Sequence, residues 1–151
     1  MERAHYTADE QRVLGLARQI LDEVFHKGDV SRIGDIVADS GTLRHPVPGM
    51  AHDRAGFSQM VGDFHAAFPG FDVIIEDNIV KGGVAVIRCT LQGTHAGPWL
   101  GVPASGKDVT VSALAYCDCG DEARVDRLRE YWLHFDALSL LHQVGGVPRI
   151  G

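Results

Sequence analysis

The spacing of the hydrophobic residues changes once along this chain, near Pro69 and Gly70. Before that point, apolar residues recur every three or four positions, which is typical of amphipathic helices. After it they alternate, which is typical of half-buried strands. Strands that follow one another in sequence usually pair as an antiparallel meander. The order therefore predicts an α+β fold in which helices cover one face of a sheet.

Three helical segments are expected before the change. The first ends at Gly28, and a short second one begins at Asp29 or Ser31. A brief extended segment over 42–47 follows, and prolines stop it. The third helix begins after Asp53. Its apolar stripe consists of Phe57, Met60, Val61, Phe64 and Phe68.

Four strands and a terminal helix are expected after the change. The strands are predicted over 71–80, 84–95, 107–119 and 124–135, and the helix over 136–144. A curved antiparallel sheet wrapped by three N-terminal helices would form a conical α+β barrel around an interior pocket. A chain of 151 residues fits one core, so we expect a single domain over residues 1–151.

The composition and charge of the chain exclude several classes of partner and location. The net charge of −6 argues against nucleic acid and against anionic membrane surfaces as partners. No apolar run approaches the roughly 20 residues of a membrane span, and the first ten residues lack the apolar stretch of a signal peptide. Three cysteines do not suggest a disulfide framework. These features together predict a cytoplasmic protein.

Alternation in the last strand sorts its side chains onto two faces. We expect the pocket to be lined by the face that mixes apolar and ionisable groups, namely Leu128, Glu130, Trp132, His134 and Asp136. The opposite face suits an outer surface or a subunit interface, and it predicts a homodimer or higher homo-oligomer. That face carries Arg127, Arg129, Tyr131, Leu133 and Phe135.

Asp136 is the sharpest candidate for chemistry. A carboxylate at the mouth of an apolar pocket would have a raised pKa and would accept a proton more readily near neutral pH. Asp136 also directly precedes Ala-Leu-Ser-Leu-Leu, where it would cap a helix. Spacing alone favours the cap, and the two roles are compatible.

Other side chains could face the same pocket. His95 ends a strand on its more apolar face, although it could simply hold the following turn. His45 could point inward from the helical side or lie exposed in a loop. Tyr116 could donate a hydrogen bond to an oxyanion, or could be a packed tyrosine. Phe64 and Trp132 would add apolar wall.

The familiar cofactor motifs are absent from the sequence. Eight histidines raise the question of a metal, but no HExxH motif and no CxxC pair is present. The glycine-rich loop after His95 lacks GxGxxG and the P-loop lysine. No GxSxG elbow is visible either. We therefore expect neither a metal nor a nucleotide.

Two segments resemble the SnoaL-like polyketide cyclase family, also called ester cyclases, within the nuclear-transport-factor-2-like fold. The first segment is Arg88-Cys89-Thr90-Leu91-Gln92-Gly93-Thr94-His95-Ala96-Gly97, followed by Gly101-Val102-Pro103-Ala104-Ser105-Gly106. The second combines Glu130, Trp132, Asp136, Leu140, Leu141, Gln143 and Gly145. Phe68-Pro69 and His45-Pro46 also look like the family. The resemblance spans about residues 10–148.

The resemblance implies a conical fold, an interior pocket and no cofactor. In the polyketide cyclases, an Asp near the end of the last strand is the acid/base of an intramolecular aldol ring closure, and Asp136 matches it. His45 and His95 match polar positions of the pocket. The chain departs from the family pattern at Ala104-Ser105, which replaces Pro-Thr, at Tyr131, which replaces the usual His, and at the additional His134.

We therefore expect a cofactor-independent cyclase acting on a hydrophobic polyketide-derived or other natural-product intermediate. Asp136 would remove a proton, and His95, His45 or Tyr116 would stabilise the resulting oxyanion. One alternative is opening of an epoxide by water or by an internal hydroxyl, with Asp136 working beside Glu130 or a histidine. Another is a protein that binds a hydrophobic small molecule without catalysis.

Overall fold

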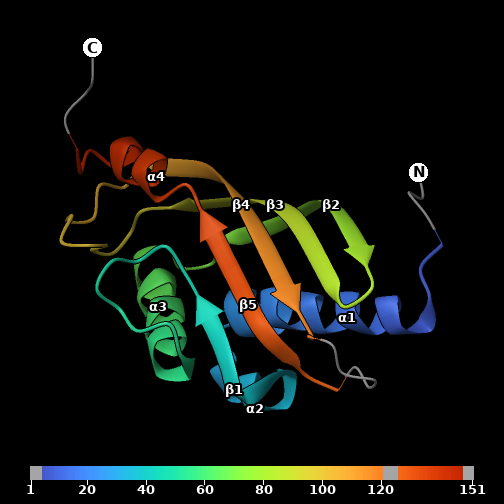
Figure 1. The fold of residues 1–151 in the computed structure, drawn as a ribbon. Coiled ribbons are helices and arrows are strands. Elements are labelled where there is room, and N and C mark those ends of the chain that lie inside the picture. The colour runs from blue at the N-terminus through green and yellow to red at the C-terminus, as the bar shows by residue number, and fades with distance from the viewer. Residues whose placement is uncertain (1–4, 121–125, 148–151) are drawn as a thin grey trace.

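The computed structural model describes residues 5–120 and 126–147, and Figure 1 shows their arrangement. The helical segments before the sheet are α1 (Ala8–Gln19), the π-helical η1 (Ile20–His26), the 3-10 turn η2 (Val30–Arg32) and α2 (Ile33–Ile36). They are followed by β1 (Val37–Arg44), α3 (Arg54–Ala67), β2 (Asp72–Lys81), β3 (Val84–Thr94), β4 (Asp108–Asp118), β5 (Leu128–Phe135) and α4 (Ala137–Gln143).

The five strands form one sheet in the order β1-β5-β4-β3-β2. β2 to β5 pair as an antiparallel meander, so the predicted α+β fold and strand order are confirmed. The sheet is curved and open, and α1 crosses one of its faces (Figure 1). β1 pairs in parallel with β5, which the sequence did not predict. It starts at Val37, five residues before the expected extended segment, because α2 ends after a single turn.

The first helix starts with a capping box, in which Thr7 and Glu10 satisfy each other's backbone N–H groups. It continues without a break into η1, and Gly28 follows in a left-handed conformation with φ +79°. The predicted extent of this helix is therefore confirmed. The π-helical turns bring four apolar side chains into the core: Ile20, Leu21, Val24 and Phe25.

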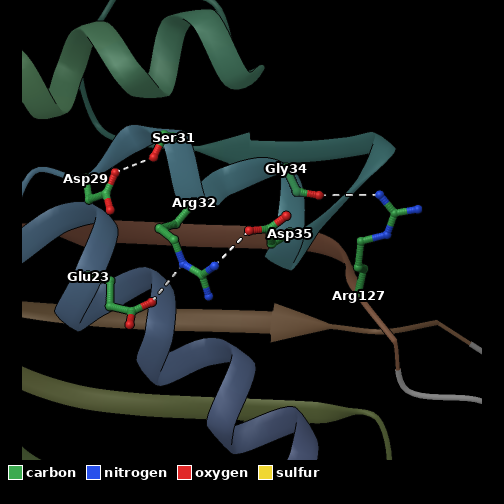
Figure 2. A network of polar contacts seen from close by, with 7 residues as sticks. All are labelled: Glu23, Asp29, Ser31, Arg32, Gly34, Asp35 and Arg127. Carbon is green, nitrogen blue, oxygen red and sulfur yellow. Dashed lines mark hydrogen bonds and ion pairs between the residues drawn. The ribbon is translucent and has the colours of Figure 1, made fainter.

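Polar contacts hold the turn between η1 and β1 (Figure 2). The Arg32 guanidinium lies 3.3 Å from a Glu23 carboxylate oxygen and 2.7 Å from one of Asp35. Arg127, just before β5, donates to the Gly34 carbonyl. These groups are partly exposed, so each ion pair contributes little to stability. Their position ties the helical region to the start of the last strand.

β4 fixes which face of the sheet is buried. Its odd-numbered residues from Val109 to Cys117 are buried, and its even-numbered ones are exposed or intermediate. Cys117 lies opposite Tyr131, and Ala113 lies opposite Phe135. Tyr131, Leu133 and Phe135 of β5 therefore belong to the core. Over residues 130–135 the predicted inside and outside faces are the wrong way round, whereas Leu128 is buried as predicted.

No helix within residues 5–120 and 126–147 has both the length and the apolar character needed to cross a membrane.

Candidate functional site

Aromatic rings fill the space between α3 and the ends of β3 and β5. Phe64 of α3 is only 3% exposed and lies at the centre of this cluster. Its neighbours, with ring-centroid distances, are Phe25 (5.2 Å), Phe68 (4.8 Å), Phe71 (4.8 Å), Trp99 (6.4 Å) and Phe135 (5.4 Å). Phe64 thus lies in the interior, and its predicted contact with a substrate stays a prediction.

Trp99 reaches this aromatic cluster from the loop between β3 and β4. Its backbone exchanges two hydrogen bonds with Val102 around a two-residue turn. Leu100 and Gly101 in that turn both have positive φ, as a type I′ turn requires. The turn directs the indole inward, where it is 3% exposed, while Leu100 stays outside. A loop side chain therefore covers the aromatic interior.

His95 follows β3 at the base of this loop and is completely buried. The Ser105 backbone N–H and the Ser105 hydroxyl both lie within hydrogen-bond distance of Nδ1, at 3.1 and 2.9 Å. A backbone N–H can only donate, so Nδ1 must accept, and the neutral ring carries its proton on Nε2. Nε2 is buried and has no hydrogen-bond partner. The ring therefore offers one unused donor beside Phe68, whose ring lies 5.4 Å away.

Burial lowers the pKa of His95 because the charged ring loses its hydration. The Gly97 backbone carbonyl raises the pKa of His95, because its dipole favours the charged ring. Its geometry nevertheless falls short of a hydrogen bond with Nε2. The neutral form of the His95 ring is thus favoured over the protonated form near neutral pH. A neutral imidazole N–H in an apolar setting can stabilise a developing negative charge by hydrogen bonding.

His45 is also buried, at 2% exposed, but both of its ring nitrogens are occupied. Nδ1 accepts from the Val47 N–H at 3.2 Å, so Nε2 carries the proton and donates to the Ala51 carbonyl at 2.9 Å. Burial lowers its pKa as well. This arrangement pins the loop between β1 and α3. Neither ring nitrogen of His45 is left free to bind a ligand, and the catalytic role of His45 stays a prediction.

Asp136 is exposed to solvent directly after β5. Its carboxylate accepts a hydrogen bond from the Ser139 N–H and caps α4. The expectation that an apolar pocket surrounds this carboxylate is therefore wrong, whereas the helix cap is confirmed. Asp136 still lies at the same end of the sheet as His95, next to Phe135, whose ring is 6.1 Å from that of Trp99.

Four predicted substrate-binding residues lie together on the face of the sheet that points away from the core. Trp132 is paired with Tyr116 across the strands, donates its indole N–H to Glu130 and lies 5.4 Å from the His134 ring. The alternation of β4 and β5 places all four opposite the buried face. Glu130 accepts from the Trp132 indole whereas Asp136 accepts from the Ser139 N–H, so the structure does not assemble the carboxylate pair considered for epoxide opening.

Tyr131 is a buried polar group that the sequence analysis placed on the outer face. Its ring is 0% exposed, and its hydroxyl has no hydrogen-bond partner. Burial raises its pKa well above the ordinary value, and nearby Cys117 and Cys89 act in the same direction. The signal that could have located it is the apolar alternation of Tyr131, Leu133 and Phe135.

The prediction of a homo-oligomer rested on these three residues, which are buried within the chain. The exposed apolar side chains of the sheet are instead Ile74, Ile79, Leu114 and Tyr116. Association of subunits therefore stays a prediction on a different set of residues.

The surface hollows of the described residues do not coincide with the candidate site residues. One surface hollow lies along α1 near Gln11 and Gly15, and another lies beside Pro48 and Gln59. Within residues 5–120 and 126–147, no group of three or more His, Cys, Asp or Glu side chains is placed to hold a metal ion. His95 with its aromatic neighbours is therefore the best-defined candidate site.

A family model for SnoaL-like polyketide cyclases matches residues 15–144, which include α3, the His95 loop and all of β5. The chain belongs to the SnoaL-like polyketide cyclase family. The comparison with curated proteins found no match.

Several proteins with solved structures share the fold of this chain at low sequence identity. A candidate SnoaL-like polyketide cyclase from Jannaschia sp. CCS1 is 19% identical, with a TM-score of 0.81 over 96% of this chain and 99% of that one. IdmH, a candidate polyketide cyclase from Streptomyces antibioticus, is 24% identical, with a TM-score of 0.68 over 92% and 99%. AclR from Streptomyces galilaeus, a candidate hydroxylase, is 18% identical, with a TM-score of 0.73 over 94% and 90%.

Proposed function

We propose that this member of the SnoaL-like family is a cofactor-independent cyclase that closes a ring within a hydrophobic polyketide-derived or other natural-product intermediate. The observation that carries the proposal is the unpaired Nε2–H of His95, buried among aromatic rings. Buried polar groups are nearly always hydrogen-bonded, so an unused donor in such a setting suits a ligand oxygen. Family membership supports the reaction class, although one fold can serve several chemistries.

In the proposed reaction, a base takes a proton from an activated carbon of the substrate. The negative charge moves to the neighbouring carbonyl oxygen, where the His95 Nε2–H stabilises it. The carbon then attacks a second carbonyl of the same molecule, which forms the ring bond and leaves an alkoxide to be protonated. Holding two ends of one chain together can supply ~7–11 kcal/mol, so shape contributes at least as much as the base.

Asp136 is the proposed base because it matches the family's acidic position and lies at the same end of the sheet as His95. Its exposure means that the substrate or the Trp99 loop must exclude water from it during the reaction. Trp99 covers the aromatic interior, so the indole must shift to admit a ring-sized ligand. The apolar lining favours a substrate with few charges.

Variants at Asp136 test the base and separate it from the helix cap. Asp136→Asn retains a capping side chain but cannot accept the proton, so turnover of a cyclisable poly-β-ketone should fall ~100- to 10,000-fold. Asp136→Ala should lose the same activity and also about 1 kcal/mol of unfolding free energy. Product formation is followed by mass spectrometry and stability by urea unfolding. Normal turnover by Asp136→Asn would remove this residue from the mechanism.

A non-catalytic binding protein is the second candidate, and the exposure of Asp136 favours it. In that case His95 and the aromatic interior would only orient a hydrophobic ligand. Saturable binding of an aromatic polyketide, with no product at any pH between 5 and 9, would support binding over catalysis.

A further inference from the structure

Arg44, at the end of β1, lies on the face of the sheet opposite the aromatic interior. Its guanidinium carbon is 4.7 Å from the centroid of the Trp132 ring, which fixes the charge above a flat support. Nη1 lies 3.4 Å from His52 Nδ1, and Nε is buried without a hydrogen-bond partner. The guanidinium therefore has most of its donors free while its position is set.

Arg44 has no carboxylate partner within the described residues. In contrast, five arginines form ion pairs with acidic side chains there: Arg12, Arg18, Arg32, Arg54 and Arg127. The nearby acids are otherwise engaged. Glu130 accepts the Trp132 indole N–H, and Asp53 caps α3 through the Gly56 N–H. Arg44 thus forms no ion pair within the described residues, although the protein has a net charge of −6.

Three histidines surround this arginine. The His45 and His52 rings lie 4.9 Å apart, and the His134 ring lies against the Trp132 ring on the neighbouring strand. The pKa of His134 is lowered by burial and further by the positive charges of His45, His52 and Arg44. His52 and His134 are exposed, so a solute can reach the group from solvent.

We propose that Arg44, His52 and His134, supported by Trp132, form a binding site for a small oxyanion such as a carboxylate or a sulfate-like group. A guanidinium with free donors recognises such oxygens through paired, charge-assisted hydrogen bonds. The Arg44 guanidinium can only donate, so His52 Nδ1 accepts from it and the neutral His52 ring offers its Nε2–H. His134 can add a further donor when it is protonated. The site lies outside the proposed cyclase interior, so it goes beyond that function and does not depend on it.

Binding is expected to strengthen as the pH falls from 8 to 5.5, with most of the change below ~6.5 because the pKa of His134 is lowered. An anion stabilises the protonated form of His134, so binding takes up a proton and the affinity rises as this ring is protonated. The charged and titratable groups around His52 and His134 are Arg44, His45, Glu130, Tyr116 and Asp53. Sulfate is the first probe because its own charge does not change over this range. Acetate is the second probe and represents carboxylates.

The test titrates the full chain with sodium sulfate and, separately, with sodium acetate at constant ionic strength in chloride. The histidine ring and indole N–H signals are followed by NMR. Saturable shifts of the His52, His134 and Trp132 signals with either salt, with tighter binding at pH 5.5 than at pH 8, support the site. The salt that saturates identifies the oxyanion class. Linear shifts with both salts would mean an adventitious ion only and would overturn the proposal.

Variants at two arginines test whether the charge of Arg44 in particular binds sulfate. Arg44→Gln should weaken sulfate binding about tenfold, whereas Arg44→Lys should restore part of it. Arg88→Gln removes the same charge from an exposed position on the same face of the sheet, but in β3. It should change the affinity for sulfate by less than about twofold. Equal losses in Arg44→Gln and Arg88→Gln would overturn the proposal.

A second variant covers the case in which Arg44→Gln does not fold. His134→Gln, at an exposed position, should weaken binding about threefold at pH 5.5 and have a smaller effect at pH 8. An identical loss at both pH values would contradict the histidine's part in the site.

Discussion

His45 and His95 are both buried and are held in the same tautomer, yet they differ at one atom. In each ring, Nδ1 accepts a backbone N–H, from Val47 in one case and from Ser105 in the other. His45 Nε2 then donates to the Ala51 carbonyl, whereas His95 Nε2 has no partner. Burial alone therefore does not distinguish the candidate site histidine from one that only holds a loop. The distinguishing feature is the donor that the fold leaves unused.

Removing the unused donor should give the largest effect. His95→Phe keeps an aromatic ring against Phe68 but loses the Nε2–H, so kcat for ring closure should fall ~100- to 1,000-fold, as for the loss of an oxyanion-hole donor. His45→Phe should reduce kcat far less. Both kcat values are measured per folded molecule after circular dichroism confirms the fold.

Ser105→Ala provides the control for this first comparison. It removes the hydroxyl near Nδ1 but keeps the Ser105 backbone N–H, and therefore the tautomer. Its kcat should stay within about tenfold of the wild type. A loss as large in Ser105→Ala as in His95→Phe would show that the orientation of the ring, rather than its Nε2–H, limits the reaction.

The occupied histidine should matter more for stability. His45→Leu leaves the Val47 N–H and the Ala51 carbonyl without their partner, which should lower the free energy of unfolding by about 2 kcal/mol. Urea unfolding followed by tryptophan fluorescence measures this loss. His52→Leu, at the exposed neighbouring ring, should cost less than about 0.5 kcal/mol. Similar losses in the two variants would contradict the role assigned to His45.

The smallest expected effect is that of pH on stability. Acid should lower the free energy of unfolding because both buried histidines resist protonation in the folded state. Burial lowers the pKa of His45 and His95 below the ~6.5 of an unfolded chain. Between ~6.5 and each lowered pKa, the unfolded state binds a proton that the folded state does not. The free energy of unfolding should therefore be constant above this range and fall as the pH drops through it.

Thermal unfolding between pH 8 and pH 5 checks this dependence. His45→Leu should show a shallower decline than the wild type, because one of the two buried titrating groups is gone. The same slope in both proteins would mean that other groups cause the acid sensitivity.

The sequence predicted the architecture because hydrophobic period and strand order are local signals. The helices, the meander and the cap at Asp136 all follow from neighbouring residues. β1 was placed too late because its pairing with β5 depends on residues nearly a hundred positions away. Such a contact has no local signature.

The faces of β5 were predicted wrongly because the ionisable residues were given more weight than the apolar alternation. Tyr131, Leu133 and Phe135 are the more apolar set, and the regular alternation of β4 fixes them inward through its register. The unpaired atoms of His95 and Tyr131 could not be predicted, because hydrogen-bond partners such as Ser105 come from loops. The family resemblance did locate His95, although not its tautomer.

The parallel pairing of β1 with β5 also affects how the chain is made. β1 leaves the ribosome early, but the strand beside it is the last of the sheet to be synthesised. Until then β1 presents unpaired backbone groups, and such an edge can recruit other strands. The long separation also slows folding, since a large loop must close before the pairing stabilises it. The nascent chain therefore depends on its final strand to cover one edge of its first strand, and β1 remains an edge strand of the finished sheet.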